Sequence, residues 1–273
     1  MEIKFVQKQK LDPKPTGALG FGKYYTDYML TADWSTEKGW HDAQIVPYGP
    51  IEFDPATIVL HYGQETFEGM KAYKSKAGEV LLFRPEMNAK RFANSNRRLQ
   101  MPALEVDDYI KAVVELVKVE QDWIATGEGE SLYIRPFMYA SEAAIGVRPA
   151  SNYKFIIILS PVGAYYPEGV NPVRIYVEEE FSRTAPGGTG IAKCGGNYAG
   201  SLPAQVRAAE LGFTQVLWLD AKTKKNVEEV GAMNVMFLIG DTVVTPQLGD
   251  TILPGITRDS IIHLLKHKGV KVE

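Results

Sequence analysis

The sequence predicts an α/β (α+β) protein of two domains, and three observations support this. Over residues 1–162, short apolar runs alternate with two amphipathic helical segments. Residues 161–172, PVGAYYPEGVNP, are rich in proline and glycine, which is typical of a connecting segment. Residues 173–273 then give mainly β-type patterns. We therefore expect an α/β domain over residues 1–162, a linker over 163–172 and a mixed-β domain over 173–273.

In the first domain, the segment EVLLFRP predicts a strand that ends at Pro85. Proline has no amide N–H to give to a sheet, but it fits the first turn of a helix, so a helix is expected to follow at once. A second helix is predicted from about Asp107 to Ile124, with Asp107 as its cap. Its apolar stripe predicts the buried face. The segments SLYIRPFMYA and KFIIILSP read as strands.

In the second domain, VRIYVEEEF, TQVLWLDA and NVMFLIGDTVVTP predict strands. The last of these segments is expected to form a hairpin that turns at Gly240 and Asp241. One helix is predicted from near Asn197 to Gly212, and another from Thr257 to just before Gly269.

Bulk properties limit the function. The chain has 273 residues, 23% of them charged, and a formal net charge of −3. This balance gives no reason to expect nucleic acid or a membrane as partner. The N-terminus resembles neither a signal nor a transit peptide. A single cysteine, Cys194, cannot form an internal disulfide and suits a reducing compartment, so a cytoplasmic protein is expected.

The segment TGIAKCGGNY places Lys193 among small and apolar residues. A surface lysine is the ordinary explanation of such a segment. A phosphate-binding loop does not fit, because Ala192 precedes the lysine and Cys194 follows it. The remaining alternative is a desolvated lysine with a lowered pKa, which can form a Schiff base with an aldehyde cofactor.

Pyridoxal phosphate (PLP) is the aldehyde cofactor that such a lysine implies, and it needs three further groups. Its ring nitrogen needs a carboxylate, for which Glu228 and Glu229 are both candidates. Its phosphate needs a helix N-terminus, and LPGITRDS offers the amides of Ile256 and Thr257. Its phenolate oxygen needs a donor, and Tyr198 lies five residues beyond Lys193.

Other candidate residues are weaker. Lys71 is a rival lysine, but its sequence neighbours are charged and polar. His263 and His267 have a metal-ligand spacing without the glutamate of the zinc-protease motif, so a solvated helix face is favoured and no metal is expected. Cys194 has no histidine near it in sequence, and is read as a packing residue.

Six segments occur in the order found in the branched-chain-amino-acid aminotransferases, which the whole chain resembles: FGKYYTDYML, HYGQETFEGMKAY, SLYIRP, KCGGNY, EEVGAMN and LPGITRDS. These are class IV aminotransferases with the PLP fold type IV. The resemblance implies a small N-terminal domain and a larger pseudo-barrel domain. It implies that Lys193 is the cofactor lysine, that Glu229 contacts the ring nitrogen and that Tyr198 contacts the phenolate. It also implies that Arg91 and the amides of Ile256 and Thr257 hold the phosphate.

The same resemblance implies a substrate pocket. Its walls are Phe21, Phe67, Tyr133, Tyr165 and Tyr198, and Arg135 is expected to meet the second carboxylate of glutamate. Tyr62, Ile145 and Val147 match positions that enter from the neighbouring subunit of a homodimer. Two departures stand out. Ala232 replaces a threonine of some members, and family members continue beyond Glu273, so the C-terminal domain is expected to be incomplete relative to the family.

The expected reaction is PLP-dependent transamination between leucine, isoleucine or valine and 2-oxoglutarate, giving branched-chain 2-oxo acids and glutamate. Lys193 is the expected catalytic base. The alternatives with the same fold are a D-amino-acid aminotransferase and an aminodeoxychorismate lyase. An alternative of another class is an inactive module that keeps PLP binding or the dimer surface.

Overall fold

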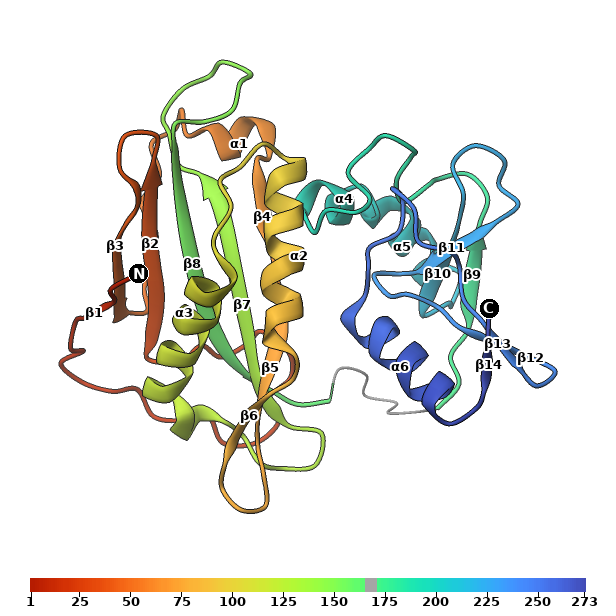
Figure 1. Cartoon of the computed structure of the whole chain (residues 1–273), viewed down its shortest axis with the longest axis horizontal. Helices are drawn as coiled ribbons and strands as arrows, with labels where there is room; N and C mark the ends of the chain where they lie inside the picture. The colour runs from red at the N-terminus through yellow and green to blue at the C-terminus, as the bar shows by residue number, and fades with distance from the viewer. Residues whose placement is uncertain (165–170) are drawn as a thin grey trace. The chain divides into compact units, whose positions relative to one another are not determined.

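The computed structural model describes residues 1–164 and 171–273 (Figure 1). It divides into two compact units, residues 1–170 and residues 171–273. This division falls inside the predicted linker, residues 163–172. Most of that segment lies outside the described residues, so its extent stays a prediction.

The described residues of the first unit form an eight-stranded sheet. Its strand order is β1-β3-β2-β8-β7-β5-β6, and β4 pairs with β7 beside this path. The strands are β1 (Lys4–Phe5), β2 (Tyr28–Ser35), β3 (Gly39–Pro47), β4 (Glu65–Phe67), β5 (Met70–Lys74), β6 (Val80–Leu82), β7 (Ser131–Ala140) and β8 (Asn152–Val162). The two predicted strands SLYIRPFMYA and KFIIILSP are thus confirmed as β7 and β8, which pair antiparallel at the centre of the sheet.

Helices α2 (Pro85–Arg98) and α3 (Val106–Val119) cover one face of this sheet (Figure 1). Pro85 occupies the first turn of α2, as predicted. The rings of Phe92, Tyr109 and Phe155 join α2, α3 and β8, with centroids 5.6 to 6.2 Å apart. All three side chains are completely buried, so the face covered by the helices contains the main apolar core.

The predicted boundaries of the second helix were wrong in two respects. Helix α3 begins at Val106 with Glu105 at its N-cap, so Asp107 lies in the first turn and does not cap the helix. Its carboxylate still lies near the positive end of the helix dipole. The helix ends at Val119, and a 3₁₀ turn, Gln121–Trp123, follows. At the end of the helix, the Glu120 side chain accepts a hydrogen bond of 2.5 Å from the backbone N–H of Tyr28, which ties this point to β2.

The described part of the second unit contains two three-stranded sheets, β11-β10-β9 and β12-β13-β14. Their strands are β9 (Ile175–Glu178), β10 (Gln215–Leu219), β11 (Val227–Val230), β12 (Phe237–Ile239), β13 (Thr242–Val244) and β14 (Lys271–Val272). The hairpin from β12 to β13 turns at Gly240 and Asp241, as predicted. Trp218 packs with Ala204, Ala208 and Val216 in a small core, and its indole N–H donates to the Gly231 carbonyl.

The helix predicted from Asn197 to Gly212 is two helices, α4 (Gly195–Ala199) and α5 (Leu202–Glu210). Pro203 lies in the first turn of α5. A proline removes one helical hydrogen bond and clashes with the preceding turn, which explains why a single helix does not form. Helix α6 (Ile256–His267) is within about one residue of its predicted ends. Every helix in the described ranges is too short or too polar to cross a bilayer.

Candidate active site

The loop that carries Lys193, residues 184–194, is held by Asn197 at the start of α4. The side-chain amide of Asn197 donates to the carbonyls of Thr189 and Ala192, both at 2.9 Å, and its oxygen accepts from the Thr189 hydroxyl at 2.6 Å. At Gly190 the loop lies against Thr251. A Cβ added there would be 2.6 Å from the Thr251 backbone, so only glycine fits. The loop is therefore fixed in place on both sides.

Lys193 contacts the tyrosine that was predicted to share its site. Its Nζ donates to the hydroxyl of Tyr198 at 2.7 Å, and it lies 5.0 Å from the centre of that ring. Lys193 lies two residues before the start of α4 and Tyr198 lies within this helix. The structure thus brings together the two residues that the sequence singled out first.

Glu229 is a buried carboxylate with a cation beside it. Its Oε2 lies 2.9 Å from Nε of Arg183, and the two side chains are 3% and 7% exposed. Its Oε1 accepts from the Leu253 N–H at 3.0 Å and from the Asn234 side chain at 3.2 Å. Burial raises the pKa of Glu229, while the charge of Arg183, the Leu253 hydrogen bond and the charge of Lys193 act in the opposite direction.

Glu228 and Glu229 have different surroundings, although both are buried in β11. Successive side chains of a strand point to opposite faces. Glu229 lines a hollow with Arg183, Asn197, Tyr198, Ser201, Gly231, Ala232 and Leu253. Glu228 accepts instead from the Thr251 hydroxyl at 2.6 Å and lines a different hollow. Only Glu229 of the two therefore shares a cavity with Tyr198, which favours it as the ring-nitrogen partner.

The start of α6 can receive an anion. Gly255 is the N-cap, and the amides of Ile256 and Thr257 lie in the first turn, where a helix cannot pair its own N–H groups. Asn234 fixes this end, because its amide donates to both the Leu253 carbonyl and Glu229. A Cβ at Gly255 would collide with the Asn234 side chain, at 1.9 Å from its Oδ1. The anion-binding end of α6 and the carboxylate are thus linked through one side chain.

In the first unit, Arg91 of α2 is held by a carboxylate that sequence analysis did not select. Glu68 is completely buried and accepts from Nε and Nη2 of Arg91 at 2.7 and 2.9 Å. Asn88 donates to the same carboxylate at 2.8 Å. This bidentate pair fixes the plane of the guanidinium, which is the group expected to bind phosphate.

Four of the predicted pocket residues lie together in the first unit. The Arg135 guanidinium carbon is 4.7 Å from the centre of the Phe67 ring and 5.3 Å from that of Tyr133. Its Nη2 donates to the Tyr133 hydroxyl at 2.9 Å. Phe21 packs edge-on against Tyr133, with ring centroids 4.9 Å apart. The result is an aromatic wall with one cation in it.

The other predicted pocket residues are placed as follows. Tyr62, Ile145 and Val147 are 43%, 69% and 83% exposed, and the Tyr62 hydroxyl donates to the Ile145 carbonyl at 2.5 Å. Tyr165 lies outside the described residues. Lys71, the rival lysine, is in β5 opposite Tyr133.

Sequence analysis missed Arg183 and Asn197, which support the predicted residues of the second unit, and Glu68, which pairs with Arg91 in the first unit. The two ion pairs join positions 46 and 23 apart in the chain (229 − 183 and 91 − 68), and no local pattern reveals such a pairing. Asn197 lies inside the quoted KCGGNY segment, where an asparagine near a helix start could have indicated backbone hydrogen bonding.

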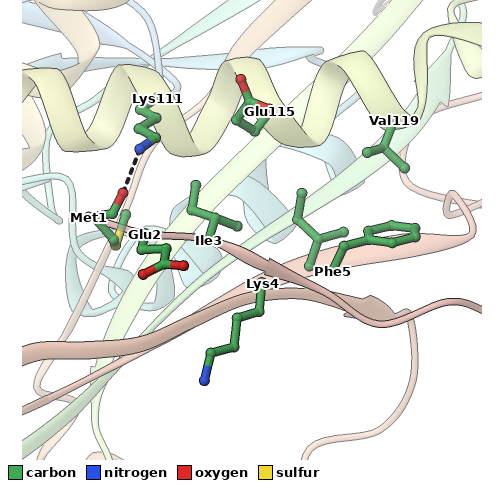
Figure 2. A pocket seen from close by; sticks show the side chains of 9 residues that line it. Met1, Glu2, Ile3, Lys4, Phe5, Lys111, Glu115 and Val119 are labelled. Atoms are coloured by element: carbon green, nitrogen blue, oxygen red, sulfur yellow. Dashed lines mark hydrogen bonds between the residues drawn. The ribbon is translucent and has the colours of Figure 1, made fainter.

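Two other features lie apart from these residues. A hollow of about 450 Å³ lies between β1 and α3. Figure 2 shows that Ile3, which lines it, points toward the helix and that Lys4 points away from it. Lys111 donates there to the Met1 carbonyl at 2.7 Å. It contains none of the predicted site residues. His263 is exposed and contacts the Asp259 carbonyl of its own helix, and the described residues contain no cluster of three or more side chains suited to a metal.

Comparison with known proteins agrees with this geometry. The family model "Amino-transferase class IV" matches residues 65–273. A "Probable branched-chain-amino-acid aminotransferase" of Staphylococcus aureus (strain N315) is 55% identical over 273 residues, which is 99% of this chain and 76% of that protein. "Branched-chain-amino-acid aminotransferase 2" of Bacillus subtilis (strain 168) is 52% identical over 100% of this chain and 74% of its own length.

Among solved structures, the branched-chain amino acid aminotransferase from Escherichia coli superposes with a TM-score of 0.71 at 26% identity, over 90% of this chain and 75% of that one. A second such enzyme, solved with pyridoxamine 5'-phosphate, is 28% identical with the same TM-score of 0.71, over 89% of this chain and 75% of its own. The chain belongs to the class IV aminotransferases, which are PLP enzymes with the fold type IV. Its relatives at more than half identity carry the name of branched-chain-amino-acid aminotransferases.

The residues present fit this cofactor. The hollow beside Glu229 has a buried carboxylate for a ring nitrogen and the Tyr198 hydroxyl for a phenolate. It also includes Gly231, whose φ of +56° makes any other residue strained at this position. The first turn of α6 offers backbone donors for a phosphate. Lys193 lies within hydrogen-bond distance of Tyr198.

Proposed function

We propose that this chain catalyses transamination between the branched-chain L-amino acids leucine, isoleucine and valine and 2-oxoglutarate. The observation that carries the proposal is the group Lys193, Tyr198 and Glu229 in one unit. Its relatives at 52% and 55% identity are named for this activity, which supports the choice of substrate class.

Each residue of the second unit has one role in this proposal. When bound, PLP supplies an aldehyde that condenses with amines and a ring that accepts electrons from the substrate Cα. Lys193 anchors the cofactor, then removes the proton from the substrate Cα and returns one at C4′. The Glu229 carboxylate keeps a proton on the ring nitrogen. Tyr198 donates a hydrogen bond to the phenolate oxygen, and the amides of Ile256 and Thr257 bind the phosphate.

Residues of the first unit take the other roles. We propose that Arg91, in the plane fixed by Glu68, binds the phosphate with bidentate-type hydrogen bonds. The rings of Phe21, Phe67 and Tyr133 suit an aliphatic side chain, and Tyr165 is assigned to the same wall. Arg135 gives the pocket a cation for the second carboxylate of glutamate. One pocket can then accept both substrates of the exchange.

Purified holoenzyme tests this proposal. The visible band of bound PLP should bleach with L-leucine, L-isoleucine or L-valine and return with 2-oxoglutarate, while D-valine leaves it unchanged. Bleaching by D-valine alone would instead indicate a D-amino-acid aminotransferase, and pyruvate release from aminodeoxychorismate would indicate a lyase. A band that persists with every amino acid would indicate an inactive cofactor-binding module.

We further propose that the enzyme is a homodimer that acts in the cytoplasm. Tyr62, Ile145 and Val147 would complete the pocket of the partner subunit. Their exposure in a single chain supports this, since exposed apolar clusters commonly mark interaction surfaces. The buried state of Cys194 is compatible with a reducing compartment.

A further inference from the structure

Arg183 contacts three separate parts of the second unit. Its Nε faces the Glu229 carboxylate at 2.9 Å. Its Nη2 donates to the Gly190 carbonyl at 3.1 Å and also to the Thr251 carbonyl. These partners belong to the ring-nitrogen carboxylate, to the Lys193 loop and to the segment that leads into α6.

The Thr251 segment connects these parts further. Its carbonyl also accepts from the Thr184 hydroxyl at 3.0 Å, and its own hydroxyl donates to Glu228. Gly190 touches the same backbone so closely that a methyl group would not fit. The rigid planar guanidinium of Arg183 faces one carboxylate and donates to two carbonyls at once, whereas a lysine ammonium is a compact charge on a flexible stem.

We infer that Arg183 is a positioning residue that keeps the Glu229 carboxylate charged and holds the Lys193 loop and the start of α6 in one arrangement. This inference rests on the proposed function, in which Glu229 acts as a carboxylate toward the ring nitrogen. Arg183 itself acts through Glu229 and through backbone carbonyls, and needs no contact with a substrate.

The charges around Glu229 decide what removal of Arg183 does. Arg183 and Lys193 are the cations that favour the ionised form, and Glu228 is the anion that opposes it. Burial also opposes the ionised form. Without Arg183, the pKa of Glu229 rises further, so the carboxylate takes up its proton at a higher pH.

The experiment compares Arg183→Gln with Arg207→Gln. Arg207 forms the matched control, since it pairs with the completely buried Glu178 of the same unit but contacts no site residue. Two readouts are used in the holoenzyme: the pH dependence of kcat and the absorbance of bound PLP titrated with pH. In Arg183→Gln, we expect the acid limb of both the kcat profile and the absorbance profile to shift to higher pH by about 1–3 pH units. A shift of this size is expected when a close counter-charge is lost. In Arg207→Gln, the acid limb of each profile should stay at its wild-type pH.

Two further variants make the result decisive. Arg183→Lys restores the charge, so its acid limb should return to within about half a pH unit of wild type, with a lower kcat because the two carbonyls lose their common donor. Adding Arg183→Gln to Glu229→Gln should leave the acid limb where Glu229→Gln alone places it, because the carboxylate that Arg183 keeps charged is then absent. If Arg183→Gln fails to fold, Arg183→Lys still tests the inference, because a lower kcat with an unmoved acid limb is expected there and an unchanged kcat would contradict it.

Three results would overturn the inference. The acid limb of Arg183→Gln could lie at the wild-type pH, or the acid limb of Arg207→Gln could shift as far as that of Arg183→Gln. The acid limb of Arg183→Lys could also differ from wild type by one pH unit or more. Failure of the proposed function looks different, since wild-type protein and the Arg207→Gln control would then lack turnover. The absorbance titration would still separate the variants in that case.

Discussion

At the scale of single residues, the second unit gives two adjacent buried carboxylates different surroundings. Glu228 and Glu229 are both buried, but only Glu229 lines the hollow that contains Tyr198. Its partner Arg183 and the Leu253 N–H offset part of the cost of burying the charge. The two faces of β11 therefore give the two carboxylates different partners.

Substitution of these two residues should separate their roles. We expect Glu229→Gln to lower kcat by about 10²-fold or more while PLP remains bound, because a neutral amide cannot hold the proton on the ring nitrogen in the transition state. Glu228→Gln should keep most of kcat, since Glu228 only accepts from Thr251. Single-turnover kinetics measure the rate of the chemical step in both variants. A large loss in Glu228→Gln with a small one in Glu229→Gln would show that the choice is wrong.

At the scale of elements, the junction between α3 and β2 contains a buried carboxyl group. Glu120 is 3% exposed and accepts from the Tyr28 N–H. The pKa of Glu120 is raised from 4.5 to about 7, chiefly by burial and also by nearby Asp27, against the opposing effect of the hydrogen bonds and of Lys8. The folded protein therefore prefers the protonated form of Glu120.

This junction should make stability depend on pH. Since the folded pKa exceeds the unfolded value, the contribution of Glu120 is complete below about pH 4.5 and is lost as pH rises through about 7. Relative to Glu120→Gln, wild type should lose roughly 3 kcal/mol of unfolding free energy between these limits. Urea denaturation at pH 4.5 and pH 8 measures this. Glu115→Gln, in an exposed pair with Lys118, should parallel wild type; a parallel curve for Glu120→Gln would contradict the assignment.

Elements were easier to predict from the sequence than their ends. The strands β7 and β8 and the hairpin at Gly240 follow local patterns of apolar and turn residues, which the structure confirms. The start of α3 and the break before Pro203 are harder to predict, because neighbouring residues one or two positions apart could equally end or begin a helix. The partners Glu68 and Arg183 depend on long-range contacts, which sequence spacing does not encode.

At the scale of the whole molecule, the proposed assembly concerns the exposed apolar residues near α1 (Ile58–Tyr62). Leu60, Tyr62, Ile145 and Val147 are all more than two-fifths exposed, and Tyr62 is bonded to the Ile145 carbonyl. A two-fold dimer would present this surface on both subunits, and each copy could reach the pocket of the other.

Subunit exchange tests this arrangement. Lys193→Ala and Val147→Asp homodimers should each be inactive, while a mixture that has exchanged subunits should recover roughly a quarter of wild-type activity. Half of its dimers are then mixed, and each mixed dimer has one intact site. Native mass spectrometry must confirm the mixed dimers. If they form without any recovery, Val147 acts in its own subunit.

Chemical trapping shows whether Lys193 carries the cofactor. Borohydride reduction of the holoenzyme followed by peptide mapping should place the pyridoxyl group on Lys193, beside Tyr198. In parallel, Lys193→Ala should lower kcat by at least about 10³-fold, while Lys71→Ala keeps most of it. A pyridoxyl group on Lys71, or full turnover in Lys193→Ala, would contradict the account.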